Sequence, residues 1–211
     1  MARGRRIPFG QSSMQTAPIV GLWALRILIG LGMHRDFLSD HGFSSDALAQ
    51  AIGLSNWIDS TRQDFDRKKV LAEMRKAHKD MEANPGEKLV PAILRDNVAQ
   101  LSKLVGLSAT DCRILEFAVM IRNESLLDEA CDRLGTLSSN KVGYALSVIL
   151  NLPEKEVRAA LSASSILAMS GLVAVDRSGV SYMQSKLDLL SDHFADLIAY
   201  SEVEPVGLLR D

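Results

Sequence analysis

Hydrophobic residues recur every three or four positions through most of the chain, and this period predicts a mainly helical protein. Prolines, glycines and capping residues such as serine separate the periodic stretches, so the pattern divides into many short helices. The predicted helices cover residues 17–33, 46–52, 64–83, 91–105, 108–121, 125–134, 138–150, 153–162 and 186–200.

The region after residue 138 has a different pattern, which predicts a helix, a turn at 151–153, a second helix and a β-hairpin. Residues 171–175 are apolar enough for a strand, 176–179 are turn-forming, and 180–183 supply a return strand. Helix-turn-helix followed by a hairpin resembles the winged-helix arrangement. The predicted fold class is therefore mainly α, with a helical bundle followed by a winged-helix-like subdomain that contains one small β-hairpin.

A sharp break at Asn84, Pro85 and Gly86 ends the charged helix before it and predicts a domain boundary. The predicted organisation has three parts. They are an N-terminal helical subdomain with a basic tail (1–84), a helical and winged-helix-like subdomain (87–184), and a C-terminal helix with a linker toward a missing module (185–211).

Composition narrows the class of protein. The 211 residues are 47% hydrophobic, which is enough to fill a core, and the net charge of -2 gives no general attraction to nucleic acid or anionic membranes. Cys112 and Cys131 lack paired spacing, which indicates free thiols in a reduced, cytoplasmic compartment. Arg26 interrupts the one long apolar stretch at a cost of roughly 2.5–3.5 kcal/mol on membrane insertion, so we expect no membrane span.

Signatures of catalysis are not found in the sequence. It contains no phosphate-binding loop, dinucleotide-binding glycine turn or nucleophile elbow. The four histidines and two cysteines do not have zinc-ligand spacing. We therefore expect no catalytic residues, cofactor or metal in this chain.

DNA binding is an alternative, because the second helix of a winged-helix regulator lies in the major groove. The candidate contacts are Lys141, Lys155, Arg158 and Arg177, with the basic tail at Arg3, Arg5 and Arg6.

Two features of the sequence disfavour this alternative. Within residues 152–183 three Lys or Arg side chains are offset by three Asp or Glu side chains, giving a local charge of zero. Specific DNA binding usually needs several phosphate contacts from Lys and Arg. In addition, Ser162, Ser164 and Ser165 are expected to interrupt the second helix, which departs from the winged-helix pattern. A winged helix used for protein contact is the favoured interpretation.

The last predicted helix places four apolar residues on one face. This face is the candidate docking surface for a partner, and it consists of Leu187, Leu190, Phe194 and Leu197. It also supports a second alternative, a stand-alone adaptor or assembly protein.

Several phrases together resemble the region that precedes the ATPase module in a group of bacterial AAA+ ATPases. They are residues 22–26, 106–117, the winged-helix stretch, and 186–191 with Phe194 and Ala195. The resemblance implies that an ATP- and Mg²⁺-binding, ring-forming motor would follow the present C-terminus, and the apolar ending at 208–211 fits a cut chain. No position matches the Walker motifs, so no nucleotide-binding residue is carried over.

These observations give one leading hypothesis. The chain is expected to be the non-catalytic recognition and regulatory region of an AAA+ ATPase. It would contact a protein substrate or partner and form a homo-oligomer through the motor ring.

Overall fold

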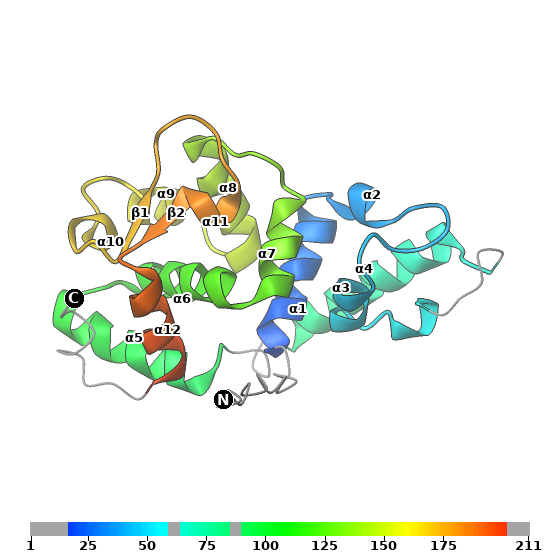
Figure 1. Ribbon diagram of the computed structural model, residues 1–211, viewed down its shortest axis with the longest axis horizontal. Coiled ribbons are helices and arrows are strands. Elements are labelled where there is room, and N and C mark those ends of the chain that lie inside the picture. Colours follow the sequence, from blue (N-terminus) through cyan, green and yellow to red (C-terminus); the bar gives the residue numbers. More distant parts are fainter. Residues whose placement is uncertain (1–16, 59–63, 85–89, 202–211) are drawn as a thin grey trace, which may run out of the picture.

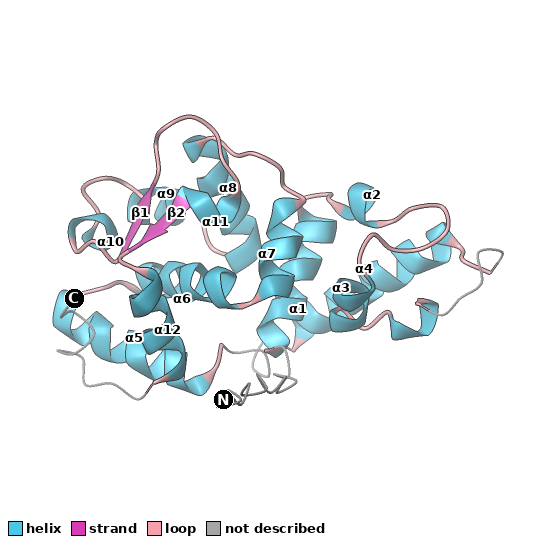
Figure 2. Cartoon of the chain, in the orientation of Figure 1, coloured by secondary structure: helices cyan, strands magenta, loops and turns pink. Residues whose placement is uncertain are grey.

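The computed structural model describes residues 17–58, 64–84 and 90–201, and these residues form a mainly helical fold with one small antiparallel sheet (Figures 1 and 2). The predictions for Arg3, Arg5, Arg6, Pro85, Gly86 and 208–211 lie outside the described residues. No helix in the described part of the chain is long and apolar enough to cross a membrane.

The elements follow in chain order. The helices are α1 (Pro18–Leu25), the π-helix η1 (Arg26–Gly30), α2 (His34–Phe37), α3 (Asp46–Ala51), the 3-10 helix η2 (Ser55–Trp57), α4 (Arg67–Ala83), α5 (Ala92–Val105), α6 (Ala109–Asn123), α7 (Ser125–Asp132), α8 (Ser139–Leu150), α9 (Glu154–Ala160), α10 (Ile166–Met169), α11 (Met183–Lys186) and α12 (Asp192–Tyr200). The strands are β1 (Val173–Val175) and β2 (Leu187–Leu189).

Local capping residues fix many of the helix ends where the sequence predicted them. Ser108 and Asp111 form a capping box at the start of α6, at the first residue of the predicted helix. Gly106 ends α5 with a left-handed φ of 84°, and Asn151 ends α8 with a φ of 53°. Ser45 accepts a hydrogen bond from the Leu48 amide at the start of α3.

The return strand of the sheet is not where the sequence predicted it. β1 pairs with β2, with Val173 opposite Leu189 and Val175 opposite Leu187, rather than with residues 180–183. β2 has the buried, exposed, buried alternation of a half-covered strand, whereas the earlier segment enters the core through Met183 in α11. Both segments carry apolar side chains at alternate positions, and packing against the rest of the protein decides between them.

The final helix is correspondingly shorter than predicted. It begins at Asp192 rather than Lys186, because the Ser191 side chain accepts a hydrogen bond from the Phe194 amide and caps the helix there. The Asn97 amide group donates to the carbonyls of Ile198 and Ser201, at 2.9 and 2.8 Å, and fixes the other end of α12 to α5.

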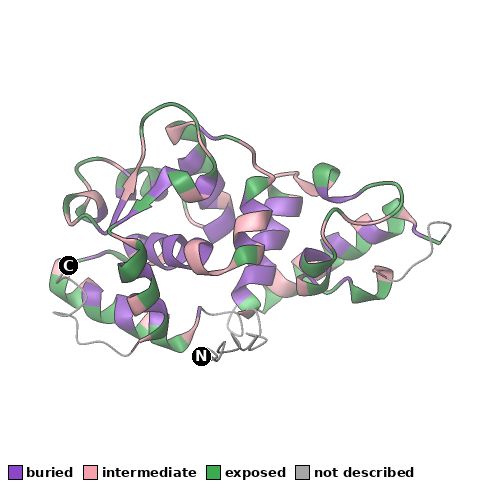
Figure 3. Ribbon diagram, in the orientation of Figure 1, coloured by how far each residue is buried: buried purple, intermediate pink, exposed green. Residues whose placement is uncertain are grey.

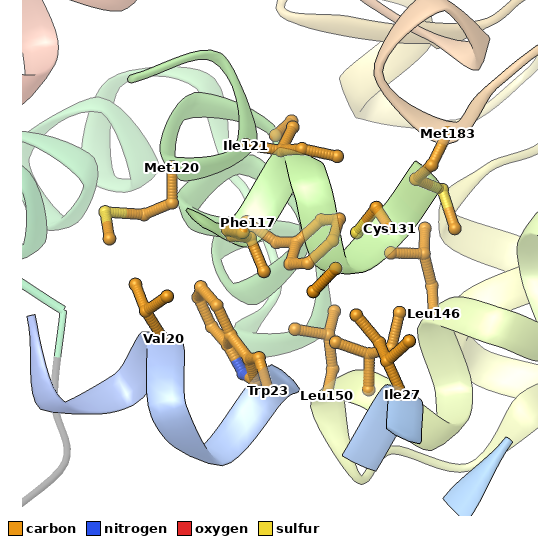
Figure 4. Close-up of a cluster of buried hydrophobic side chains, with 14 of the residues drawn as sticks. Val20, Trp23, Ile27, Phe117, Met120, Ile121, Cys131, Leu146, Leu150 and Met183 are labelled. Atoms are coloured by element: carbon orange, nitrogen blue, oxygen red, sulfur yellow. The ribbon is translucent and has the colours of Figure 1, made fainter. Parts of the chain in front are cut away.

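A single hydrophobic core joins the two halves of the chain. Helix α6 packs against α5, α7, α9 and α12, and all its residues from 114 to 121 are buried (Figure 3). Trp23 of α1 meets Phe117 of α6 edge to face, with ring centroids 5.3 Å apart (Figure 4). Residues on both sides of the predicted boundary at 84–87 therefore share one core, and this boundary does not separate two cores.

Helices α1 and α3 approach closely at Gly21. A Cβ atom at this position would lie 2.8 Å from the backbone oxygen of Ala51, so only glycine permits this contact.

Candidate recognition surface

The two helices of the predicted helix-turn-helix are present, but the second is short. Helix α8 packs against α9 across the turn at Asn151 and Pro153. Helix α9 contains seven residues and ends at Ala160. The expected interruption by serines is confirmed, because Ser165 caps a separate helix, α10, through the Ala168 amide.

Arg158, one of the candidate DNA contacts, forms an ion pair within its own helix. Its guanidinium pairs with Glu154 one turn earlier, at 2.6 and 2.8 Å. Its stem covers Gly143 of α8, where a Cβ atom would lie 3.2 Å from the Arg158 Cγ. The side chain therefore contributes to the contact between α8 and α9.

Arg177 also bonds within the protein, since its Nη2 donates to the Leu161 carbonyl oxygen at 3.1 Å. Arg158 and Arg177 line the same small pocket, of about 80 Å³, together with Ser139 and Asn140 at the start of α8. The structure thus brings two of the four candidate DNA contacts together. Lys141 and Lys155 are exposed and do not line this pocket.

The predicted docking face on the last helix is not available as a continuous surface. Leu187 lies in β2 rather than in the helix and is fully buried, and Phe194 is 1% exposed. Leu197 is partly buried against the core. Only Leu190 is exposed, at 40%. The prediction is wrong because the apolar face of α12 packs against α5 and α6.

An exposed apolar group that the sequence did not reveal lies beside Leu190. Helix α10 presents Ile166 and Met169 to solvent, and Met169 is 77% exposed. Leu190 is next to Gly171, two residues beyond Met169, with its Cδ1 3.8 Å from the position of a glycine Cβ. We call Ile166, Met169 and Leu190 the α10 patch.

An open cleft of about 450 Å³ borders the α10 patch. Ile166 lines it, with residues from the start of α6, from α9 and from the serine-rich turn before α10. The Thr110 hydroxyl donates to a Glu156 carboxylate oxygen at 3.0 Å along its wall. The walls combine small apolar and hydroxyl side chains with the carboxylates of Asp111 and Glu156, and a shallow cleft of this kind suits an extended or helical peptide better than a small molecule.

The loop after β1 is organised by a buried lysine. The Nζ of Lys186 is 2.7 Å from the Asp176 carbonyl oxygen, 3.0 Å from that of Gly179 and 3.4 Å from that of Ser178, and the side chain is 0% exposed. The hydroxyl and amide of Ser178 donate to the Asp176 carboxylate and lower its pKa, and the Lys186 charge lowers it further.

Neither cysteine has the environment of a reactive thiol. Burial raises the pKa of Cys131, which is 1% exposed, and also that of Cys112. Within the described ranges, no group of three or more His, Cys, Asp or Glu side chains could hold a metal ion.

The sequence missed the α10 patch and Lys186 for different reasons. Ile166 and Met169 have the spacing of a buried helix face, and only the tertiary structure shows that they remain exposed. Lys186 follows Gln184 and Ser185 and precedes Leu187 and Asp188, so nothing in the local sequence indicates that its charge is buried.

Comparison of the chain with protein families, curated proteins and solved structures finds no match.

Proposed function

We propose that this chain is a non-catalytic recognition and regulatory region that contacts a protein substrate or partner through the α10 patch and its adjoining cleft. The exposure of Met169 and its neighbours is the observation that carries the proposal. Met is enriched at protein interfaces. Large apolar side chains that are exposed next to one another on a protein surface often mark an interaction site.

We also propose that the region works beside an AAA+ motor, as the sequence resemblance implies. ATP and Mg²⁺ would then bind to the motor, and none of the residues discussed here would hold them. The first test is to read the native coding sequence beyond codon 211. A phosphate-binding Gly-x-x-x-x-Gly-Lys-Ser/Thr loop after a strand would support the association, and a frame without any ATPase would contradict it.

The recognition surface requires a separate test in the full-length protein. Proximity cross-linking in cells would identify a partner, and its affinity for the purified protein would then be measured directly. We expect Met169→Asp to weaken binding at least about tenfold, as for truncation of an interface hot spot. Tyr144→Asp is the matched control, because Tyr144 is 51% exposed on α8, a helix that contributes no residue to the α10 patch or to the cleft. Equal affinities for the two variants would refute the proposed surface.

A winged-helix DNA-binding regulator is retained as a second proposal, because Arg158 and Arg177 line one pocket. It requires tight binding to one defined duplex, lost when Lys155 and Arg158 are changed together. The ion pair between Arg158 and Glu154 disfavours it, since the guanidinium would have to leave this partner to reach a phosphate.

A further inference from the structure

Helix α4 segregates positive charge in a chain whose overall charge is slightly negative. Its 17 residues include six Lys or Arg side chains, all of them exposed. Arg67 and Lys69 pair with Asp40 and Asp66, at 3.5 and 3.6 Å. The other four are Lys68, Arg75, Lys76 and Lys79, which we call the α4 basic stripe. None of these four makes an ion pair with another described residue.

The four cations share one side of the helix. At 3.6 residues per turn, Lys68, Arg75 and Lys79 fall within about 40° of one another around the axis, and Lys76 lies about 60° further round. The row is about 16 Å long. Val70 and Met74, the buried residues of α4, lie on the opposite side, so the α4 basic stripe faces outward.

The carboxylates of α4 are directed elsewhere or lie on its flank. Glu73 accepts a hydrogen bond from the Trp57 Nε1 at 2.6 Å, and Glu82 pairs with Arg26 at 2.6 Å. Asp80 is one turn after Lys76 and about 40° from it around the axis, so it lies on the flank of the α4 basic stripe, where these two described residues form no ion pair. The row therefore presents positive charge without an internal counter-ion.

The chemistry of the α4 basic stripe indicates the kind of partner. Three of its four residues are lysines, which are depleted at protein interfaces, and no large apolar side chain lies among them. Insertion into a membrane surface needs an apolar face, but that of α4 is buried against the protein. A row of cations with no anchor for base edges matches a regularly spaced line of phosphates.

We propose that the α4 basic stripe binds the phosphate backbone of a nucleic-acid duplex without reading its sequence. This site is separate from the predicted helix-turn-helix, because α4 extends toward the end of the molecule opposite the sheet (Figure 1). It is also independent of the proposed protein contact through the α10 patch.

The test measures the binding of a short DNA duplex to the full chain by fluorescence anisotropy, at several salt concentrations and with a second duplex of shuffled sequence. Four phosphate contacts predict a slope of log K against log salt of about -3.6, so affinity should fall about 150-fold between roughly 50 and 200 mM salt. Both duplexes should bind equally well.

Two matched triple variants then locate the site. Lys68→Gln, Lys76→Gln and Lys79→Gln together should bring the slope to about -0.9 and weaken binding at low salt at least about tenfold. Lys103→Gln, Lys141→Gln and Lys155→Gln together remove the same charge from exposed positions elsewhere and should leave binding unchanged. Thermal melts would verify that both variants fold.

Every other result overturns the proposal. An equal loss of DNA affinity in the two variants would show that binding depends on overall charge rather than on the α4 basic stripe. A loss confined to the second variant, or a preference for one duplex, would move the contact to the helix-turn-helix. Absence of binding at low salt would exclude a nucleic-acid site. Stronger stripe-dependent binding to phosphatidylserine vesicles than to DNA would make a membrane surface the partner.

Discussion

Arg26 and Glu82 form a two-point ion pair between the first helical segment and the end of α4. The Arg26 Nε and Nη2 donate to the two Glu82 carboxylate oxygens at 2.6 and 2.8 Å. The Arg26 Nη1 also donates to the Ile149 carbonyl oxygen at 2.7 Å, in the last turn of α8, where carbonyls lack helical partners. One buried side chain thus links three helical segments that are far apart in the sequence.

Replacing Arg26 with alanine should lower the free energy of unfolding by about 3 kcal/mol. This is the lower end of the range for breaking a buried pair, because the Glu82 side chain is 33% exposed and can partly rehydrate. Urea denaturation followed by circular dichroism would measure the change. Arg67→Ala is the control, because its pair with Asp40 is exposed and should contribute less than about 1 kcal/mol. Similar losses in both variants would show that burial is unimportant.

The pH dependence of stability should report the Glu82 pair. Hydrogen bonds from Arg26 hold the Glu82 pKa below its usual value, so the stabilisation is present above the usual glutamate pKa and lost as pH falls through the lowered one. Glu82→Gln should cost about 1–2 kcal/mol at neutral pH. The gap between the variant and the wild type should close in acid. A gap that stays constant with pH would contradict the assignment.

Glu116 should show the opposite dependence. Burial raises its pKa more than the neighbouring Arg113 lowers it, and the side chain is 8% exposed. The folded protein therefore retains this proton to higher pH than the unfolded chain, and stability falls as pH rises from the usual to the raised pKa. Glu116→Gln should stabilise the protein at neutral pH by about 1 kcal/mol or less, with no gain in acid. Urea titrations alongside Glu82→Gln would show trends of opposite sign.

Lys186→Met should loosen the loop that follows β1. The variant keeps most of the side-chain volume but removes the donor to three backbone carbonyls, and a loss of about 1–3 kcal/mol is expected. The backbone amides of Leu137 and Ser181 each donate to the carbonyl oxygen of the other residue, at 2.7 and 3.2 Å. Hydrogen exchange at these two amides should be faster in the variant. Lys141→Met, at an exposed site, should change neither quantity. Unchanged protection in Lys186→Met would mean that the loop is ordered without the lysine.

Helix ends were predictable because their determinants are local. The capping box of Ser108 and Asp111 lies within one turn of helix, and Gly106 and Asn151 can adopt left-handed conformations with little strain. Each of these signals acts over only a few residues, so it can be recognised from the sequence alone.

The sheet and the candidate recognition surface depended on longer-range contacts. Residues 180–183 and Leu187–Leu189 both carry apolar side chains at alternate positions, so the sequence offers two return strands. In the structure Met183 is buried in the core and the second segment pairs with β1. In the same way, the periodicity of α12 could not show whether Phe194 is buried against the protein or exposed to a partner. The spacing of Ile166 and Met169 in α10 could not show that these side chains are exposed. Arg26 was recognisable as unusual in an apolar helix, but its partner lies 56 residues away.

The shared core also determines what can be removed from this protein. Trp23 and Val20 come from one side of segment 85–89, and Phe117, Leu146 and Leu150 come from the other (Figure 4). A chain cut within that segment would give two fragments that each expose half of an interior, so neither should fold alone. Mixed together, they should complement each other and restore the native helical spectrum. Both halves are therefore required for a stable fold, and they should unfold together in one cooperative transition.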